Sequence, residues 1–178
     1  HTDVVHLPWL EGRGEMTWDV RTEGGSVGTL RAGAAGPVSL AARAGKLAGI
    51  DVRAALLDGR SELGRQGSAR QREFNAASTT SFSEMKARFE LNDGRAAGQN
   101  LELHSASINA VGSGELTLST GTIDLRFDAS LARPTHELNA FAGVSVPIQV
   151  DGAWRLPRFT LDFGAATGPN GLATPRPS

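Results

Sequence analysis

The sequence contains no cysteine, and this absence excludes several kinds of chemistry. Without thiols the chain has no disulfide scaffold, no thiolate metal site and no cysteine nucleophile. Tyrosine is also absent, and aromatic residues make up only 6% of the 178 residues. The formal net charge is −1, so the chain lacks the excess of basic side chains that is typical of nucleic-acid-binding proteins. We therefore expect no nucleic-acid partner.

Long hydrophobic runs are also missing, because no apolar stretch approaches the ~20 residues that a membrane-spanning helix needs. The chain begins with His1 and shows no signal peptide, so we expect it to be a domain excised from a longer protein. Its content of 39% hydrophobic and 21% charged residues is that of a globular domain. We expect one domain over residues 3–163, followed by a disordered tail over residues 164–178.

Between Ser83 and Leu131, apolar and polar residues alternate with a period of two. Side chains of a strand point to opposite faces in turn, so this period indicates strands with one apolar and one polar face. Breaks at 92–94, at Gly98, at 112–114 and at 119–121 separate four runs and predict an antiparallel meander. The predicted apolar surface consists of Met85, Phe89, Leu91, Ile123, Leu125 and Phe127.

Two short helices are expected to cover part of this surface. Ser26 caps the first, over residues 26–32, and Asp51 caps the second, over residues 51–63. Gly59 weakens the second helix by ~1 kcal/mol, so its later half is expected to fray. The polar residues 65–80 show no periodicity and predict a mobile loop. The fold class is thus α+β, with a mainly antiparallel curved sheet.

A further alternating run precedes the tail, and it contains a proline. Pro147 cannot donate to a strand ladder, so the run over residues 144–150 is predicted to be an edge strand. An edge strand can pair with the sheet of another protein by strand addition, and the first predicted strand, roughly residues 13–22, is an alternative for this pairing. The residues of this partner strand are Val144, Val146, Ile148 and Val150.

Motifs that carry catalysis or bind cofactors find little support. Residues 24–28 match the nucleophile motif G-x-S-x-G, but that motif requires a parallel sheet with helices on both faces. His6, His104 and His136 lack the spacing of metal ligands. Carboxylates on the polar strand faces are expected to be solvated. The sequence therefore predicts no enzyme, no metal and no cofactor.

The order and spacing of several segments resemble the C-terminal region of the AsmA family of bacterial envelope proteins. The resemblance covers roughly residues 11–163 and leaves out the polar segment 65–80. The segments that carry it are 36–40 (GPVSL), 45–57 (GKLAGIDVRAALL), 82–94 (FSEMKARFELNDG), 101–105 (LELHS), 111–118 (VGSGELTL), 121–127 (GTIDLRF) and 146–157 (VPIQVDGAWRLP).

This resemblance implies a protein anchored in the inner membrane by an N-terminal helix that this chain lacks, with the rest in the periplasm. The family is linked to outer-membrane biogenesis and to the carriage of phospholipids along a β-sheet groove, without catalysis. Two roles follow as expectations. Either phospholipid acyl chains lie along the apolar surface, or the domain docks on another envelope protein by strand addition. For the apolar surface itself, the alternative is an ordinary core beneath the helix at 51–63.

Overall fold

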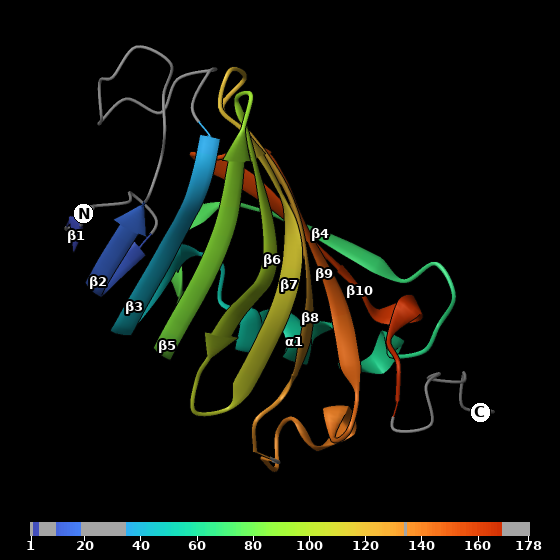
Figure 1. Cartoon of the computed structure of the whole chain (residues 1–178). Coiled ribbons are helices and arrows are strands. Elements are labelled where there is room, and N and C mark those ends of the chain that lie inside the picture. Colours follow the sequence, from blue (N-terminus) through green and yellow to red (C-terminus); the bar gives the residue numbers. More distant parts are fainter. Residues whose placement is uncertain (1, 4–9, 19–34, 134, 169–178) are drawn as a thin grey trace.

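The computed structural model describes residues 2–3, 10–18, 35–133 and 135–168. Over these residues, ten strands form one curved antiparallel sheet in the order β1-β2-β3-β5-β6-β7-β8-β9-β10-β4 (Figure 1). The strands are β1 (Thr2–Asp3), β2 (Leu10–Trp18), β3 (Ala35–Gly49), β4 (Ala69–Glu73), β5 (Asn75–Asn92), β6 (Arg95–His104), β7 (Ile108–Thr117), β8 (Thr122–Leu131), β9 (Ser145–Ala153) and β10 (Leu156–Asp162).

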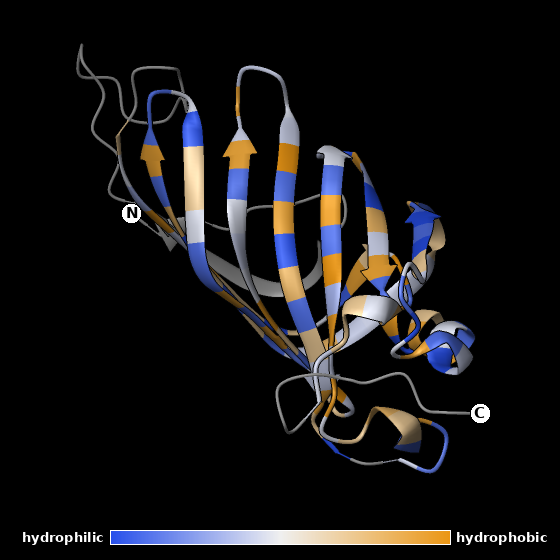
Figure 2. Cartoon of the chain, turned by 90° about the vertical axis from the view of Figure 1, so that its right-hand side faces the viewer, coloured by the Kyte–Doolittle hydropathy of each residue, from blue (hydrophilic) through white to orange (hydrophobic). Residues whose placement is uncertain are grey.

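The predicted meander is confirmed, since each strand from β5 to β9 pairs with the next strand along the chain. Apolar and polar bands alternate along these strands in Figure 2, as a period of two requires. Two of the predicted breaks are wrong, because Gly98 lies within β6 and residues 112–114 lie within β7. Glycine is tolerated there because the neighbouring strands bring side chains close to its backbone, as described below.

The segment that connects β3 to β5 covers part of one face of the sheet. It contains α1 (Val52–Gly59), the 3₁₀ turn η1 (Arg60–Glu62) and β4. β4 pairs with β10 at the far edge of the sheet, whereas β5 returns to pair with β3. Only Phe74 separates β4 from β5. We call the side of the sheet on which α1 packs the inner face, and the opposite side the outer face.

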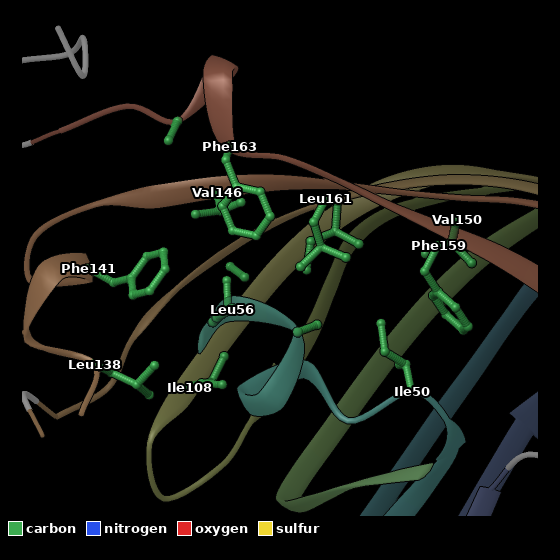
Figure 3. Packing of buried hydrophobic residues seen from close by; sticks show 14 residues of the cluster. Ile50, Leu56, Ile108, Leu138, Phe141, Val146, Val150, Phe159, Leu161 and Phe163 are labelled. Carbon is green, nitrogen blue, oxygen red and sulfur yellow. The ribbon is translucent and has the colours of Figure 1, made fainter. Parts of the chain in front are cut away.

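The main core lies between α1 and one end of the inner face. Leu56 is 2% exposed and lies among side chains from β7, β9 and β10 and from the segments around Phe141 and Phe163 (Figure 3). The rings of Phe141 and Phe163 are tilted against each other with centroids 6.4 Å apart. The core cluster consists of Ile50, Ala55, Leu56, Ile108, Ala129, Leu138, Phe141, Val146, Ile148, Val150, Phe159, Leu161, Phe163 and Ala166.

The helix begins as predicted but ends earlier. The carboxylate of Asp51 accepts a hydrogen bond of 3.1 Å from the Ala54 N–H, which is an N-cap. The predicted helix over 51–63 is instead α1 followed by η1. Gly59 is buried at the junction, and a Cβ at that position would overlap the ring of Phe163. The predicted helix over 26–32 lies outside the described residues.

The buried hydroxyl of Thr80 on β5 fixes the start of α1 to the sheet. It donates a hydrogen bond of 2.6 Å to the carbonyl oxygen of Ile50 and accepts one of 3.1 Å from the Val52 N–H. These two bonds satisfy backbone groups that would otherwise be buried without a partner. The side chain of one strand residue therefore sets where the helix lies against the inner face.

Two further predictions are wrong. Residues 144–150 do not form an edge strand, because β9 lies between β8 and β10. The β9–β10 ladder ends at the pair of Ile148 and Leu161, so Pro147 has a ladder partner on β8 only. Residues 65–80 are not a loop, since they contain β4 and the start of β5.

The predicted tail begins within ordered structure. Residues 163–165 form the 3₁₀ turn η3 (Phe163–Ala165), Ala166 is buried, and Thr167 forms a backbone bridge to Ser145. Gly164 lies so close to the backbone of Arg65 that a side chain at position 164 would overlap the Arg65 carbonyl oxygen. These packing contacts order the chain as far as residue 168, and residues 169–178 lie outside the described part.

Candidate functional site

The six predicted apolar residues lie on one face of the sheet. Cross-strand pairs connect Phe89 to Gly98, Gly98 to Gly114 and Gly114 to Leu125. Directly paired residues point to the same side, so Phe89 and Leu125 share a face, and Phe127 follows two residues after Leu125. The same argument places Met85, Leu91 and Ile123 on this face, which is the inner face.

The structure does not gather these six residues into one cluster. Ile123, Leu125 and Phe127 are partly buried and pack against the core beneath α1. Met85 belongs to a second cluster that also contains Ala42, Phe82 and Leu103. Leu91 belongs to a third cluster with Ala96, against which Phe89, Leu116 and Leu118 pack.

Burial decreases along the inner face from one end of β7 and β8 to the other. The end near α1, which we call the helix end, contains Ile108 and Ala129, with exposed fractions of 2% and 1%. The opposite end lies beside the turns that join β5 to β6, β7 to β8 and β9 to β10, and we call it the turn end. There the paired residues Leu116 and Ile123 are only partly buried. Apolar surface of β7 and β8 is thus partly exposed at the turn end, whereas Leu91 and Ala96 of β5 and β6, at the same end, are buried at 3% and 6%.

Two aromatic rings on the inner face lie across glycines of the neighbouring strand. A Cβ at Gly98 would overlap the ring of Phe89, and a Cβ at Gly112 would overlap the ring of Phe127. Each ring occupies the space that a side chain at the glycine would need. The glycine pattern that suggested turns therefore shapes the inner face instead.

The outer face carries charged side chains that pair along and between strands. Lys86 Nζ lies 2.9 Å from Glu84 Oε1, and Arg158 Nε lies 3.6 Å from Asp151 Oδ1. The ion pair with Lys86 lowers the pKa of Glu84, first through its hydrogen bond and then through its charge. A hollow of about 320 Å³ lies over β3, β5 and β6, beside Asn100. It is lined by Ser39, Leu40, Ala41, Lys86, Ala87, Arg88, Asn100 and Glu102.

The histidines singled out in the sequence do not form a metal site among the residues that the structure describes. No three His, Asp or Glu side chains of that part lie close enough together to hold a metal ion. His104 Nδ1 lies 2.9 Å from the Asn109 amide oxygen, and His136 is exposed. His6 and the motif at 24–28 lie outside the described residues.

Ion pairs hold α1 and η1 to β4. Arg72 pairs with Asp58, and the guanidinium of Arg70 donates two hydrogen bonds, of 2.6 and 3.0 Å, to the Glu62 carboxylate. Arg70 and Arg72 are the cross-strand partners of Leu161 and Phe159, so they belong to the inner-face positions of β4. The sequence showed only a polar stretch here, because the inner positions of this strand face the polar side of the helix.

The pair of Arg70 and Glu62 predicts a specific pH dependence. The hydrogen bond from Arg70 holds the pKa of Glu62 below its ordinary value of 4.5. The interaction that lowers the pKa of Glu62 in the folded state stabilises the fold, and this stabilisation is fully present above pH 4.5. It is lost as the pH falls through the lowered pKa. We therefore expect the melting temperature of Glu62→Gln to fall less than that of the unchanged chain between about pH 7 and about pH 3.

The control for this measurement is Glu84→Gln, which removes the Glu84–Lys86 pair on the outer face and leaves β4 untouched. Amide protection of β4 on acidification separates the two variants, because only Glu62→Gln should reduce the loss of that protection, while the Arg72–Asp58 pair remains in both. Equal acid-induced loss of β4 protection in Glu62→Gln and the unchanged chain would contradict the prediction.

Comparison with protein families gives one match. A sequence model described as the AsmA family matches residues 2–101, which is more than half of the chain. The matched region includes β3, α1 and β5 and most of β6. No match was found to a curated protein or to a solved structure. No helix in the described ranges is long and apolar enough to cross a membrane.

Proposed function

The chain belongs to the AsmA family of bacterial envelope proteins, and from this premise we propose that it binds phospholipid acyl chains on the inner face of its sheet. The proposed role is non-enzymatic transport of phospholipid between the inner and outer membranes during outer-membrane biogenesis. The domain would work on the periplasmic side of the envelope, in a full-length protein that an inner-membrane anchor holds.

The observation that carries the proposal is the incomplete cover at the turn end. Leu116 and Ile123 point to the inner face and are only partly buried there, and Leu125, also partly buried, follows Ile123 on the same face toward the core. An acyl chain that lies along these side chains gains about 0.8 kcal/mol for each CH₂ that it removes from water. The polar head group would stay at the turn end of the sheet, beside the turns, in contact with water.

Binding of acyl chains is tested with two double variants at one level of the sheet. In Leu116→Gln with Ile123→Gln, polar amides replace a cross-strand pair of the inner face. In the control, Glu115→Gln with Asp124→Gln, amides replace the neighbouring pair on the outer face. We expect uptake of a fluorescent phospholipid to fall about tenfold in the first variant, because acyl contacts are lost, and to stay unchanged in the control.

Lipid extraction and mass spectrometry of the purified chain complete this test. Phospholipid that co-purifies with the unchanged chain and is depleted in the inner-face variant supports the proposal. A lipid-free chain that takes up no probe would contradict it, as would equal uptake by both double variants.

Docking by strand addition is less well supported. The strand expected to pair with a partner, β9, is already paired on both sides. Among the strands with described side chains, only β4 lies at an edge of the sheet. β4 carries Arg70, Arg72 and Glu73, and charged residues on an edge strand discourage pairing with other chains.

A further inference from the structure

The tip of the β9–β10 hairpin exposes apolar side chains to water. Trp154 is 36% exposed and Leu156 is 66% exposed. Across the described ranges, the other large apolar side chain with comparable exposure is Val111, at 47% on the outer face of β7. Residues 153–156 therefore concentrate apolar exposure in one turn, with Arg155, which is also exposed, between the two apolar side chains.

Backbone hydrogen bonds tie this tip to the other turns at the same end. The Trp154 N–H donates to the Gly121 carbonyl oxygen at 2.9 Å, and the Leu118 N–H donates to the Gly94 carbonyl oxygen at 2.8 Å. The turns after β5, β7 and β9 are thus joined in a row, which we call the rim. The rim lies at the end of the strands away from α1 (Figure 1).

The rim borders the partly exposed end of the inner face. Ile123 pairs with Leu116 on one side and with Gly152 on the other, and Gly152 precedes Trp154 by two residues. A molecule that enters or leaves the inner face at the turn end therefore passes the hairpin tip. The position of the tip connects its exposed side chains to the surface that is proposed to bind acyl chains.

The charge carried by the tip itself, on Arg155, favours an anionic partner. Asp151, the nearest acidic residue on β9, lies 3.6 Å from Arg158, and Asp124 accepts a hydrogen bond from Gln149. Within the described residues, no ion pair uses Arg155. An amphipathic tryptophan, an exposed leucine and a free cation form the combination that suits the interface of a lipid bilayer.

We propose that the rim docks on the surface of an anionic lipid bilayer through residues 153–156. Trp154 and Leu156 enter the interfacial layer, and Arg155 contacts a phosphate or an acidic head group. The turn end of the inner face then opens toward the membrane. This inference rests on the proposed function, because the docked bilayer supplies or receives the acyl chain.

Flotation with vesicles tests the docking. Vesicles of phosphatidylethanolamine and phosphatidylglycerol are compared with vesicles of phosphatidylcholine. We expect Trp154→Ala with Leu156→Ala to reduce binding to the anionic vesicles about tenfold. Arg155→Glu is expected to reduce it about fivefold on anionic vesicles and to have little effect on phosphatidylcholine. Val111→Ala, which removes a similarly exposed apolar side chain away from the rim, should bind as the unchanged chain does.

A site-specific probe gives a second measurement. Because the chain has no cysteine, Leu156→Cys can be labelled at one position with an environment-sensitive dye, and Val111→Cys serves as the matched control. Anionic vesicles should shift the emission of the dye at position 156 to the blue and leave the dye at position 111 unchanged. Equal shifts at both positions, or none at position 156, would overturn the docking.

The results separate this inference from the proposed function. If the unchanged chain takes up phospholipid from dilute dispersion but binds no vesicles, the docking is wrong and the acyl-binding role stands. If it binds vesicles through residues 153–156 but takes up no lipid, the docking is supported and the acyl-binding role is wrong. If the tip variants lose a protein partner while vesicle binding is unchanged, the docking is also overturned.

Discussion

Replacing Leu56 with alanine is expected to lower the free energy of unfolding by about 2–5 kcal/mol. Leu56 is 2% exposed and lies where α1 meets the sheet, so its loss leaves a cavity between the two. The expected loss is a large part of the roughly 5–15 kcal/mol by which such domains are stable. Chemical denaturation followed by circular dichroism measures it.

Leu57→Ala is the matched control, because it removes the same atoms from the next position of α1. Leu57 is only partly buried against the same core, so we expect a loss of about 1 kcal/mol. Helix propensity changes equally in both variants, and the difference between them reports burial alone. Equal losses in the two variants would show that Leu56 is not inserted beneath the sheet as described.

Replacing Gly112 with alanine is expected to destabilise the sheet by about 2–3 kcal/mol. The added Cβ would overlap the carbonyl oxygen of Arg126 and the ring of Phe127, and the backbone oxygen cannot move without disturbing the β7–β8 ladder. Where a site has room, the same change stabilises a protein by about 0.4–1 kcal/mol, so the sign of the effect is informative.

Two further alanine variants give reference values for the loss of stability in Gly112→Ala. At Gly98 the atoms nearest to an added Cβ belong to the side chains of Phe89 and Leu101, which can shift, so the loss for Gly98→Ala should be smaller than that for Gly112→Ala. Ser113→Ala changes an exposed position of β7 and should stay within about 0.5 kcal/mol of the unchanged chain. If Gly112→Ala were as stable as Ser113→Ala, Phe127 would not lie over Gly112.

The local elements could be predicted from the sequence because their signals are local. A period of two fixed which residues of β5 and β8 share a face, and Phe89 and Phe127 do lie on the same side. Asp51 was recognisable as a helix cap because its carboxylate acts on an N–H only three residues away. The family resemblance, too, is confirmed by the match over residues 2–101.

Long-range pairing was not visible in the sequence. Arg72 on β4 pairs with Phe159 on β10, and nothing in the sequence of either segment indicates that the two strands are neighbours. The inner-face positions of β4 are arginines because they bind the acidic side of α1 and η1, so the strand has no apolar alternation. For Pro147, the rule that proline marks an edge failed because the β10 ladder ends next to it.

Glycines were misread for a related reason. Gly59 was expected to weaken the helix, and α1 does end there, but the sequence did not show that its lack of a side chain also admits the ring of Phe163. Gly98 and Gly112 appeared as turns, but they lie under aromatic rings within strands. A glycine required by its neighbour cannot be told from a flexible glycine until the neighbour is known.

The cover that α1 places on only one end of the inner face has a consequence for lipid traffic. A binding groove that is open at both ends lets lipids move through it in one direction. A groove that is closed at one end must release a bound lipid through the end by which it entered. Under the proposed function, the fatty tail enters first and the head group stays at the mouth. Over β7 to β10, onward passage past Leu56 would then require α1 to move away from the sheet, so a lipid on these strands would leave by the way it entered.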